Sequence, residues 1–296
     1  DPRDSDRPAL SSPLDVAVFR IANHHRSDLI CTAMAAGIAT AGDRPVIFDE
    51  KNYAGPEALA AKVAVFYGLE GNLPRVFNDF AKLGRAVYVD LGYWGRREGG
   101  RWSGYHKISV NARHPVGYYR KPDHPNDRLQ HFGIVPAKWR RTGGEFILLA
   151  GMGDKGAYAE GFEPEQWERW AIAEIQRYTK RRILYRAKPS WKTAKPIAGT
   201  VWSDPKVSVD AELARAWAVV THHSNVAVDA ILAGVPAFCW GGVAREMSLQ
   251  DLSRIEDPWF PGGRKQWAAD IAYTQWSVEE MRTGLPWVHL KREKII

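Results

Sequence analysis

A polar turn in residues 219–238 has the residue types needed to bind a phosphate group. A β-branched run predicts a strand that ends near Thr221, Ser224 and Asn225 follow in the turn, and a helix of small residues begins directly after them. Unpaired N–H groups and the positive dipole end at a helix N-terminus attract anions, and the Ser224 hydroxyl adds a donor. Asp229, one turn into this helix, is placed to accept a hydrogen bond from a ribose hydroxyl. An ordinary helix cap without a ligand is the alternative interpretation.

A basic segment, residues 85–143, points to a second kind of partner. It holds twelve Lys and Arg residues against four acids, a net charge of +8 in a chain whose total is +7, and aromatic residues are interleaved with the cations. Cations that meet phosphates and rings that stack on bases are what a nucleic-acid-binding surface needs. A solvated basic face with some core aromatics is the alternative. The side chains predicted to contact DNA are Arg96, Arg97, Arg101, Lys107, Arg113, Arg120 and Lys121.

The hydrophobic pattern predicts two successive series of strand–helix–strand units, which build doubly wound sheets. The predicted strands of the first series are 14–22, 44–50 and 85–92, and its predicted helices are 23–42 and 57–68. The pattern restarts after Gly143 and Gly144, with the main predicted strands at 145–150, 182–186 and 216–221 and a predicted helix at 164–181. The long segment between the two series predicts a functional loop.

We therefore expect an α/β protein of two Rossmann-like domains that face each other across a cleft, because 296 residues exceed what one core usually supports. The predicted domains are residues 1–143 and residues 144–264, and residues 265–296 are predicted to form a C-terminal helix that packs back on the N-terminal domain.

The composition is that of a globular protein, with 45% hydrophobic and 25% charged residues. Its two cysteines stand far apart, without the spacing of a zinc site or a disulfide framework, which indicates a cytoplasmic protein without a structural metal. No apolar run approaches the about 20 residues that span a bilayer, so no membrane partner is expected. The polar first residues lack the apolar core of a targeting peptide.

The sequence THHSN, followed by VDAILAGVP, resembles the donor-binding signature of GT-B glycosyltransferases. The resemblance implies a GT-B-type fold whose C-terminal domain binds a nucleotide sugar, a UDP-sugar being the first choice, without a metal. Two further segments, GMGDKG at 151–156 and YRAKP at 185–189, stand where this family places phosphate-facing groups. Cations opposite a helix N-terminus would stabilise the leaving diphosphate. The donor-binding residues expected on this basis are Gly153, Lys155, Arg186, Lys188, His222, His223, Ser224, Asn225 and Asp229.

A second resemblance, over residues 85–290, is to bacteriophage proteins associated with DNA hypermodification, and rests on YVDLGYWGR and DPWFPGGRKQWAADIAYTQWSVEEMRTG. It implies that the N-terminal domain binds double-stranded DNA in the cytoplasm of an infected bacterium. The sugar would be transferred to the hydroxymethyl group of 5-hydroxymethylcytosine or 5-hydroxymethyluracil.

A primary alcohol acceptor requires a general base within hydrogen-bond reach. Asp90, at the end of a predicted strand, lies where open α/β sheets place functional groups, and His24 and His25 follow the first strand in an equivalent position. Asp90 is the first candidate, with a helix-capping or arginine-pairing role as the alternative.

Two other functions remain open at this point. A cytoplasmic glycosyltransferase for capsule or other cell-surface saccharide would have no need of the basic segment, and a non-catalytic DNA-binding protein would have no need of a diphosphate site. Neither GxxxxGK[ST] nor GxGxxG occurs, which disfavours a P-loop kinase or a dehydrogenase.

Overall fold

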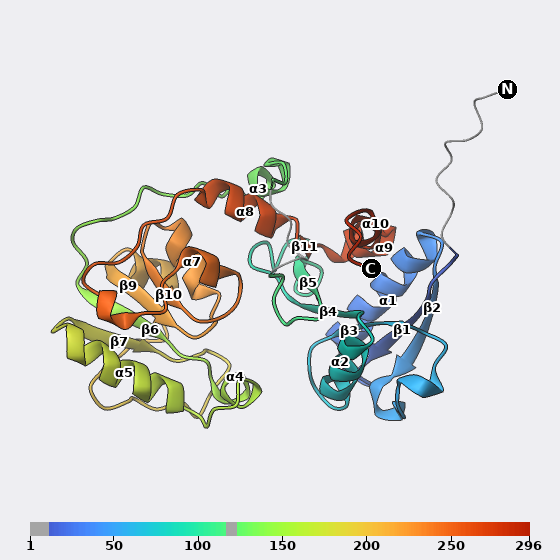
Figure 1. Cartoon of the computed structure of the whole chain (residues 1–296), viewed down its shortest axis with the longest axis horizontal. Coiled ribbons are helices and arrows are strands. Elements are labelled where there is room, and N and C mark those ends of the chain that lie inside the picture. Colours follow the sequence, from blue (N-terminus) through green and yellow to red (C-terminus); the bar gives the residue numbers. More distant parts are fainter. Residues whose placement is uncertain (1–11, 117–122) are drawn as a thin grey trace. The chain divides into compact units, whose positions relative to one another are not determined.

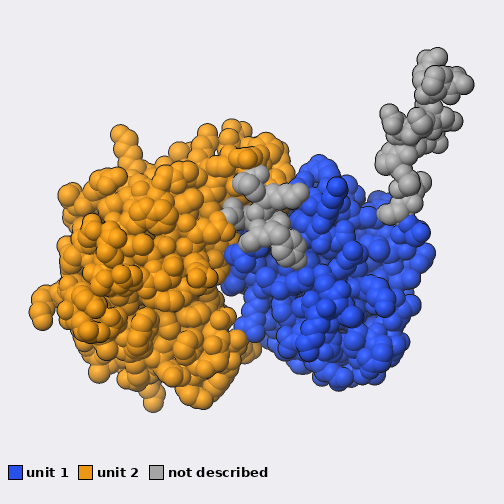
Figure 2. Space-filling model, viewed as in Figure 1, with its two compact units in different colours: residues 1–119, 274–296 blue, residues 120–273 orange. Residues whose placement is uncertain are grey.

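The computed structural model describes residues 12–116 and 123–296, and the chain forms two compact units (Figure 1, Figure 2). Unit 1 comprises Asp1–Tyr119 and Thr274–Ile296, and unit 2 comprises Arg120–Tyr273. Each unit has one sheet of mainly parallel strands with helices packed against it.

The sheet of unit 1 has six strands in the order β11-β5-β4-β3-β1-β2. Strands β1 to β4 pair in parallel, whereas β5 runs antiparallel to both β4 and β11. The strands are β1 (Asp15–Arg20), β2 (Arg44–Asp49), β3 (Val63–Tyr67), β4 (Ala86–Leu91), β5 (His106–Val110) and β11 (Gln275–Trp276). The helices are α1 (His25–Thr40), α2 (Leu73–Lys82), α9 (Val278–Thr283) and α10 (Leu285–Arg292), with short 3-10 turns at Glu50–Asn52 and Pro56–Ala58.

Alternating side chains of the unit 1 strands form two cores, one on each face of the sheet. Val16 and Val18 pack in a cluster with residues of α1, α9 and α10, whereas Ala17 and Phe19 pack in a second cluster with residues of α2. Successive residues of a strand point to opposite faces, so a strand buried on both faces is apolar throughout. This pattern explains why β1 and β3 are continuous apolar runs.

The C-terminal residues complete unit 1 by packing against α1. A Cβ atom on Gly37 would lie 1.9 Å from the carbonyl oxygen of Met281, so only glycine permits this close approach of α1 to α9. The indole Nε1 of Trp287 donates to Oδ2 of buried Asp43 at 2.7 Å, and Nζ of Lys291 lies 2.9 Å from the same oxygen. These contacts hold α10 on the N-terminal sheet.

Two segments of unit 1 differ from the sequence-based prediction. Residues 57–68 were expected to be helical, but Val63–Tyr67 form a central strand, because a buried run of this kind has no periodicity that separates helix from strand. Strand β5 lies inside the segment that we expected to be a loop. Its five residues are all buried, which tertiary pairing with β4 explains.

The sheet of unit 2 has five parallel strands in the order β10-β9-β6-β7-β8. The strands are β6 (Phe146–Ala150), β7 (Arg182–Arg186), β8 (Val201–Trp202), β9 (Ala216–Thr221) and β10 (Ala237–Cys239). The helices are α3 (Asp127–His131), α4 (Asp154–Ala159), α5 (Gln166–Tyr178), α6 (Val209–Leu213), α7 (Val226–Leu232) and α8 (Arg264–Ala272), with 3-10 turns at Val243–Met247 and Leu252–Arg254. Residues of α5 pack on one face of the sheet and residues of α6 and α7 on the other.

The segment before β6 is anchored in unit 2, so the chain divides at residue 119 and not at the expected residue 143. Nε1 of Trp139 donates to the carbonyl oxygen of Pro261 at 3.0 Å, and Nη2 of Arg140 donates to that of Leu213 at 2.6 Å. The chain returns to unit 1 at residue 274, so α8 belongs to unit 2 and the later helices to unit 1.

The predicted fold class, α/β with two Rossmann-like halves and a C-terminal segment that returns to the first, is confirmed. Among the described residues, no helix is both long and apolar enough to cross a membrane.

Candidate functional site

Asp90, the first candidate for a general base, lies near the carboxyl end of β4. Its Oδ2 lies 3.6 Å from Nζ of Lys107, the residue directly opposite on β5. The Asp90 side chain is 35% exposed, whereas that of Lys107 is only 5% exposed. Nζ of Lys107 also lies 3.2 Å from Nδ1 of His114. The carboxylate is therefore accessible at the sheet edge while a buried cation fixes its orientation.

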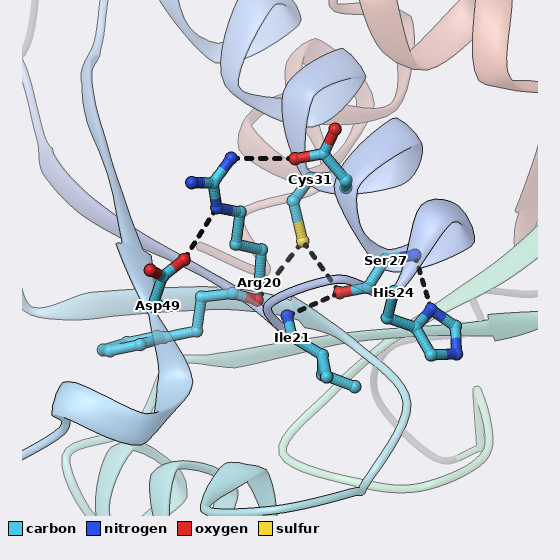
Figure 3. Close-up of polar contacts among 8 residues, drawn as sticks. Arg20, Ile21, His24, Ser27, Cys31 and Asp49 are labelled. Carbon is cyan, nitrogen blue, oxygen red and sulfur yellow. Dashed lines mark hydrogen bonds and ion pairs between the residues drawn. The ribbon is translucent and has the colours of Figure 1, made fainter.

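His24 lies in the turn between β1 and α1, at the same carboxyl edge of the sheet (Figure 3), and His25 is the first residue of α1. His24 is the N-cap of α1, where its Nδ1 accepts from the backbone N–H of Ser27 at 3.1 Å. The Ser27 hydroxyl oxygen accepts from the backbone N–H of Ile21 at 2.9 Å, which closes the turn. Because Nδ1 of His24 accepts, Nε2 is the ring nitrogen that carries a proton and can donate a hydrogen bond. His25 is exposed at the first position of the helix.

The same edge contains two residues that the sequence analysis missed, Arg26 and His106. Nη1 of Arg26 donates to the Tyr67 hydroxyl at 2.8 Å, and the Tyr67 and His106 rings lie 5.9 Å apart. His106 is directly opposite Leu91 on β4, so it points to the sheet face opposite that of Asp90 and Lys107. The alternating run after Tyr105 was the available signal for a strand, and with it for the position of His106.

The residues predicted to contact DNA fall into four groups. Arg96, Arg97 and Arg101 are exposed in the segment between β4 and β5. Lys107 is 4% exposed and therefore offers a phosphate no surface, so we leave it out of the proposed DNA contacts. Arg113 is half-buried and already interacts with other groups. Two further candidates, Arg120 and Lys121, lie outside the described residues.

In unit 2, the structure brings several predicted donor-binding residues together at the carboxyl ends of β6, β7 and β9. A Cβ atom on Gly153, which has φ of +76°, would lie 3.2 Å from Cδ of Lys188. A Cβ atom on Gly156 would lie 3.7 Å from Nε2 of His223. The N-cap and first residues of α4 therefore lie close to the segment after β7 on one side and to the segment after β9 on the other. Lys188 itself is exposed.

Ser224 and Asn225 form the start of α7, but the Ser224 hydroxyl already has a local partner. Its Oγ accepts from the backbone N–H of Val226 at 3.3 Å, and the Ser224 N–H donates to Oγ1 of Thr221 at 3.3 Å. Asn225 is the N-cap residue and makes no side-chain capping hydrogen bond. Helix α7 has only seven residues, so its dipole contributes less than that of a long helix. Asp229 is half-buried within this helix.

His222 and His223 follow β9, with their Nδ1 atoms 2.9 Å apart. Burial lowers the pKa of His222, so its ring is neutral near pH 7. The ring packs edge-on against Phe162 and Trp167 at 5.6 Å each. These contacts make His222 part of the aromatic core, whereas His223 lies beside Gly156. Lys155, the last of the predicted donor residues, is exposed on α4.

Arg186 has a different environment from the one expected. Its Nη1 lies 2.8 Å from Oε2 of Glu212, which is almost fully buried, and also donates to Oγ of Ser203 and to the carbonyl oxygen of Val207. A guanidinium group held in this way stabilises the β7–α6 connection. We therefore leave Arg186 out of the proposed phosphate contacts.

Glu168 is a buried acid that the sequence analysis did not single out. Its Oε1 accepts from the backbone N–H of Met152 at 2.8 Å, which orients the turn that leads to Gly153. Its other oxygen and the Tyr185 hydroxyl have no hydrogen-bond partner among the described atoms. Burial raises the pKa of Glu168, and the Met152 hydrogen bond opposes the shift. An acid within the apolar stripe of the predicted helix was the available signal.

Both cysteines are free and buried, and burial raises the pKa of each thiol to about 12. The Cys31 thiol donates to the carbonyl oxygen of Phe19 and lies beside the Ser27 hydroxyl (Figure 3). Neither thiol is a nucleophile at neutral pH. No group of three or more His, Cys, Asp or Glu side chains that could hold a metal ion occurs among the described residues.

No protein family and no curated protein sequence matches this chain. Among solved structures, the chain is similar to the beta Kdo 2,7 transferase of Thermosulfurimonas dismutans KpsC, with a TM-score of 0.54 and 14% identity over 93% of this chain and 99% of that chain. It is also similar to the beta Kdo 2,4 transferase of the same KpsC, with a TM-score of 0.51 and 14% identity over 88% of this chain and 92% of that one. At this identity the likeness shows a common fold, and it supports the predicted GT-B type.

Proposed function

We propose that the protein is a glycosyltransferase that moves a sugar from a nucleotide-sugar donor to a hydroxyl group. The observation that carries this proposal is the cluster of Gly153, Lys188 and His223 at the carboxyl edge of the unit 2 sheet. Ligands of open α/β sheets bind at this edge. The similarity to two Kdo transferases over most of the chain gives further support.

The donor site is proposed to hold the diphosphate beside Gly153 and Gly156, at the start of α4. Lys188 and Lys155 supply positive charge, and the Ser224 hydroxyl supplies a hydrogen-bond donor. Cations and oriented donors stabilise the charge that develops on a leaving diphosphate, and no metal is required for this role. Asp229 is assigned to a ribose hydroxyl, and a UDP-sugar is the first choice of donor.

The acceptor is proposed to be the hydroxymethyl group of 5-hydroxymethylcytosine or 5-hydroxymethyluracil in double-stranded DNA. The exposed guanidinium groups of Arg96, Arg97 and Arg101 support this choice, because phosphate contacts dominate affinity for DNA. Asp90 is assigned as the base that removes the hydroxyl proton. A modified base would have to leave the stack to reach it, at a cost of a few kcal/mol that backbone contacts offset.

A saccharide acceptor is the second candidate, and the comparisons favour it. Both similar structures are described as Kdo transferases, and Kdo is a sugar. A protein of this kind would modify a cell-surface or capsule glycan, and its arginines would bind an acidic sugar.

One experiment separates the two candidates. The full chain is incubated with a panel of nucleotide sugars and either 5-hydroxymethylated duplex DNA or short acidic and neutral oligosaccharides, and the products are digested and analysed by mass spectrometry. A nucleoside with the mass of one added sugar supports the DNA acceptor, and a lengthened oligosaccharide supports the second candidate. Unchanged masses with every donor and acceptor would contradict glycosyl transfer.

A further inference from the structure

A cavity of about 790 Å³ lies within unit 1 on the sheet face that carries α1. It is lined by the start of α1, the end of β4, the segment that follows β4 and the first residue of β5. The lining includes Arg26, Arg96, Arg97, Arg101, Trp102 and His106. The lining residues that the structure describes all belong to unit 1.

The cavity concentrates positive charge, because four arginines line it. None of its four guanidinium groups forms an ion pair with a carboxylate in the part of the chain that the structure describes. The guanidinium carbon of Arg26 lies 3.7 Å from the centre of the Trp102 ring, and that of Arg101 lies 4.6 Å from it. Nε of Arg96 donates to the carbonyl oxygen of Gly92. Arginines held by rings and backbone, without an acid, are preorganised for an external oxyanion.

His106 supplies a hydrogen-bond acceptor, whereas the arginines supply donors. The side chain is 1% exposed, and its Nδ1 donates to the carbonyl oxygen of Gly104 at 2.9 Å, so the proton of the neutral ring is on Nδ1. Nε2 therefore has a free lone pair, and it has no hydrogen-bond partner among the described atoms. Burial lowers the pKa of His106 to about 4, and the nearby charge of Arg26 acts in the same direction. A buried acceptor without a donor is unfavourable unless a ligand supplies one.

We propose that this cavity binds a hydroxylated organic anion, whose oxyanion contacts the arginines and whose hydroxyl group donates to Nε2 of His106. The oxyanion is a phosphate ester of a nucleotide or the carboxylate of a sugar acid, since arginine binds both in the same geometry. Asp90, the proposed base, lies on the opposite face of the sheet, so this site is separate from the one where Asp90 would meet the acceptor hydroxyl. The binding itself requires no turnover and can be measured alone.

The test uses two anionic probes and their uncharged counterparts with the full chain. The probes are 5-hydroxymethyl-2′-deoxycytidine 5′-monophosphate and glucuronic acid, and the counterparts are 5-hydroxymethyl-2′-deoxycytidine and glucose. Calorimetric titration is expected to show that one anion binds at least about tenfold more tightly than its counterpart, and which anion does so identifies the source. Equal binding of charged and uncharged probes, or no binding of either anion at millimolar concentration, would overturn the proposal.

Variants assign the binding to the cavity. Arg97→Gln with Arg101→Gln should weaken binding of the anion about tenfold or more, whereas Lys62→Gln with Lys82→Gln removes the same charge from other exposed positions and should leave it unchanged. Equal effects of the two double variants would show a diffuse charge effect and no site.

The role of His106 is tested with a probe that lacks the hydroxyl. For the nucleotide this probe is 5-methyl-2′-deoxycytidine 5′-monophosphate, and for the sugar acid it is tetrahydropyran-2-carboxylic acid, which keeps the ring and the carboxylate without the hydroxyl groups. The wild-type protein should prefer the hydroxylated probe by about fivefold to tenfold, and His106→Phe should lose this preference while still binding the anion. An unchanged preference in the variant would remove His106 from the site. Sugar transfer without anion binding would refute the anion site and leave the proposed function intact. Anion binding without any transfer would refute the proposed function and leave the anion site intact.

Discussion

Nζ of Lys107 lies 3.6 Å from the carboxylate of Asp90, at directly paired positions of two antiparallel strands. The lysine is buried and the aspartate is partly exposed, so one partner stabilises the sheet edge and the other faces the solvent. Asp90 therefore has two roles to distinguish: it pairs with buried Lys107, and it is the proposed general base. A substitution of Asp90 alone would change both.

Replacement of Asp90 should affect activity and stability through different routes. We expect Asp90→Asn to lower the free energy of unfolding by about 1–3 kcal/mol, because Lys107 loses its charged partner. Sugar transfer should fall by about 100-fold or more, because the proposed base is lost. The second substitution Lys107→Met should restore stability without restoring activity, as denaturant titration and kcat would show. A double variant that regains activity would assign Asp90 a purely structural role.

The donor site is tested by removing its exposed cation and its hydroxyl. Ser224→Ala with Lys188→Ala should weaken binding of a nucleoside diphosphate about tenfold or more, because a charge-assisted contact to phosphate is lost. Lys192→Ala, an exposed lysine in the same connection, is the matched control and should bind as the wild type does. Titration calorimetry with UDP and other nucleoside diphosphates measures both. Unchanged affinity in the double variant would place the diphosphate elsewhere.

Salt dependence reports the proposed phosphate contacts of Arg96, Arg97 and Arg101. For duplex DNA, each neutralised phosphate contributes a slope of about −0.9 in a plot of log K against log salt concentration. We therefore expect the triple glutamine variant to bind DNA with a slope shallower by roughly 0.9 for each arginine that contacts a phosphate. Fluorescence anisotropy between low and moderate salt gives the slope. A variant whose slope equals that of the wild type would exclude these arginines from the DNA contacts.

The buried ring of His106 makes stability depend on pH in a defined window. The ordinary pKa is 6.5 and the folded value is about 4, because of burial and the charge of Arg26. Between these values the unfolded chain binds a proton that the folded chain does not, so the free energy of unfolding falls as the pH falls, by at most about 3 kcal/mol.

In the variant His106→Gln, the side chain at position 106 does not bind a proton in this pH range. The difference in stability between wild type and variant should therefore change between pH 7 and pH 4, as urea titrations would reveal. Asp90 and Arg96, the other charges that act on this ring, are present in both proteins and act as an internal control. A difference that is constant with pH would show that the ring titrates normally.

For Glu168 we expect stability to change with pH in the opposite direction to that for His106. Its pKa is raised by burial, so its contribution to stability is present below the ordinary value of 4.5 and is lost as the pH rises through the folded value. Glu168→Gln keeps an oxygen for the N–H of Met152 and carries no charge. We expect the variant to have a higher Tm than the wild type at pH 8 and no advantage at pH 4. A lower Tm at pH 8 would show that the charged form is stabilised by a partner.

Local pattern was sufficient for most of the strands and helices. Residues 14–22, 85–92 and 216–221 were predicted as strands because continuous β-branched runs between turn residues have few other stable conformations. Local pattern was insufficient at 57–68 and 106–110, since a short apolar run becomes a strand only when neighbouring strands accept its backbone hydrogen bonds.

The sequence by itself determined the α/β class, the two series of strands and the position of polar residues at strand ends, because these follow from periodicity along the chain. Only the tertiary structure decided which cations pair with acids of the protein and which can bind a ligand. Lys107 is buried beside Asp90 and the partly buried Arg186 pairs with Glu212, whereas Arg26 joins the exposed arginines beside His106. The physical reason is that charge availability depends on burial and on partners far away in sequence, and neither can be read from composition or spacing.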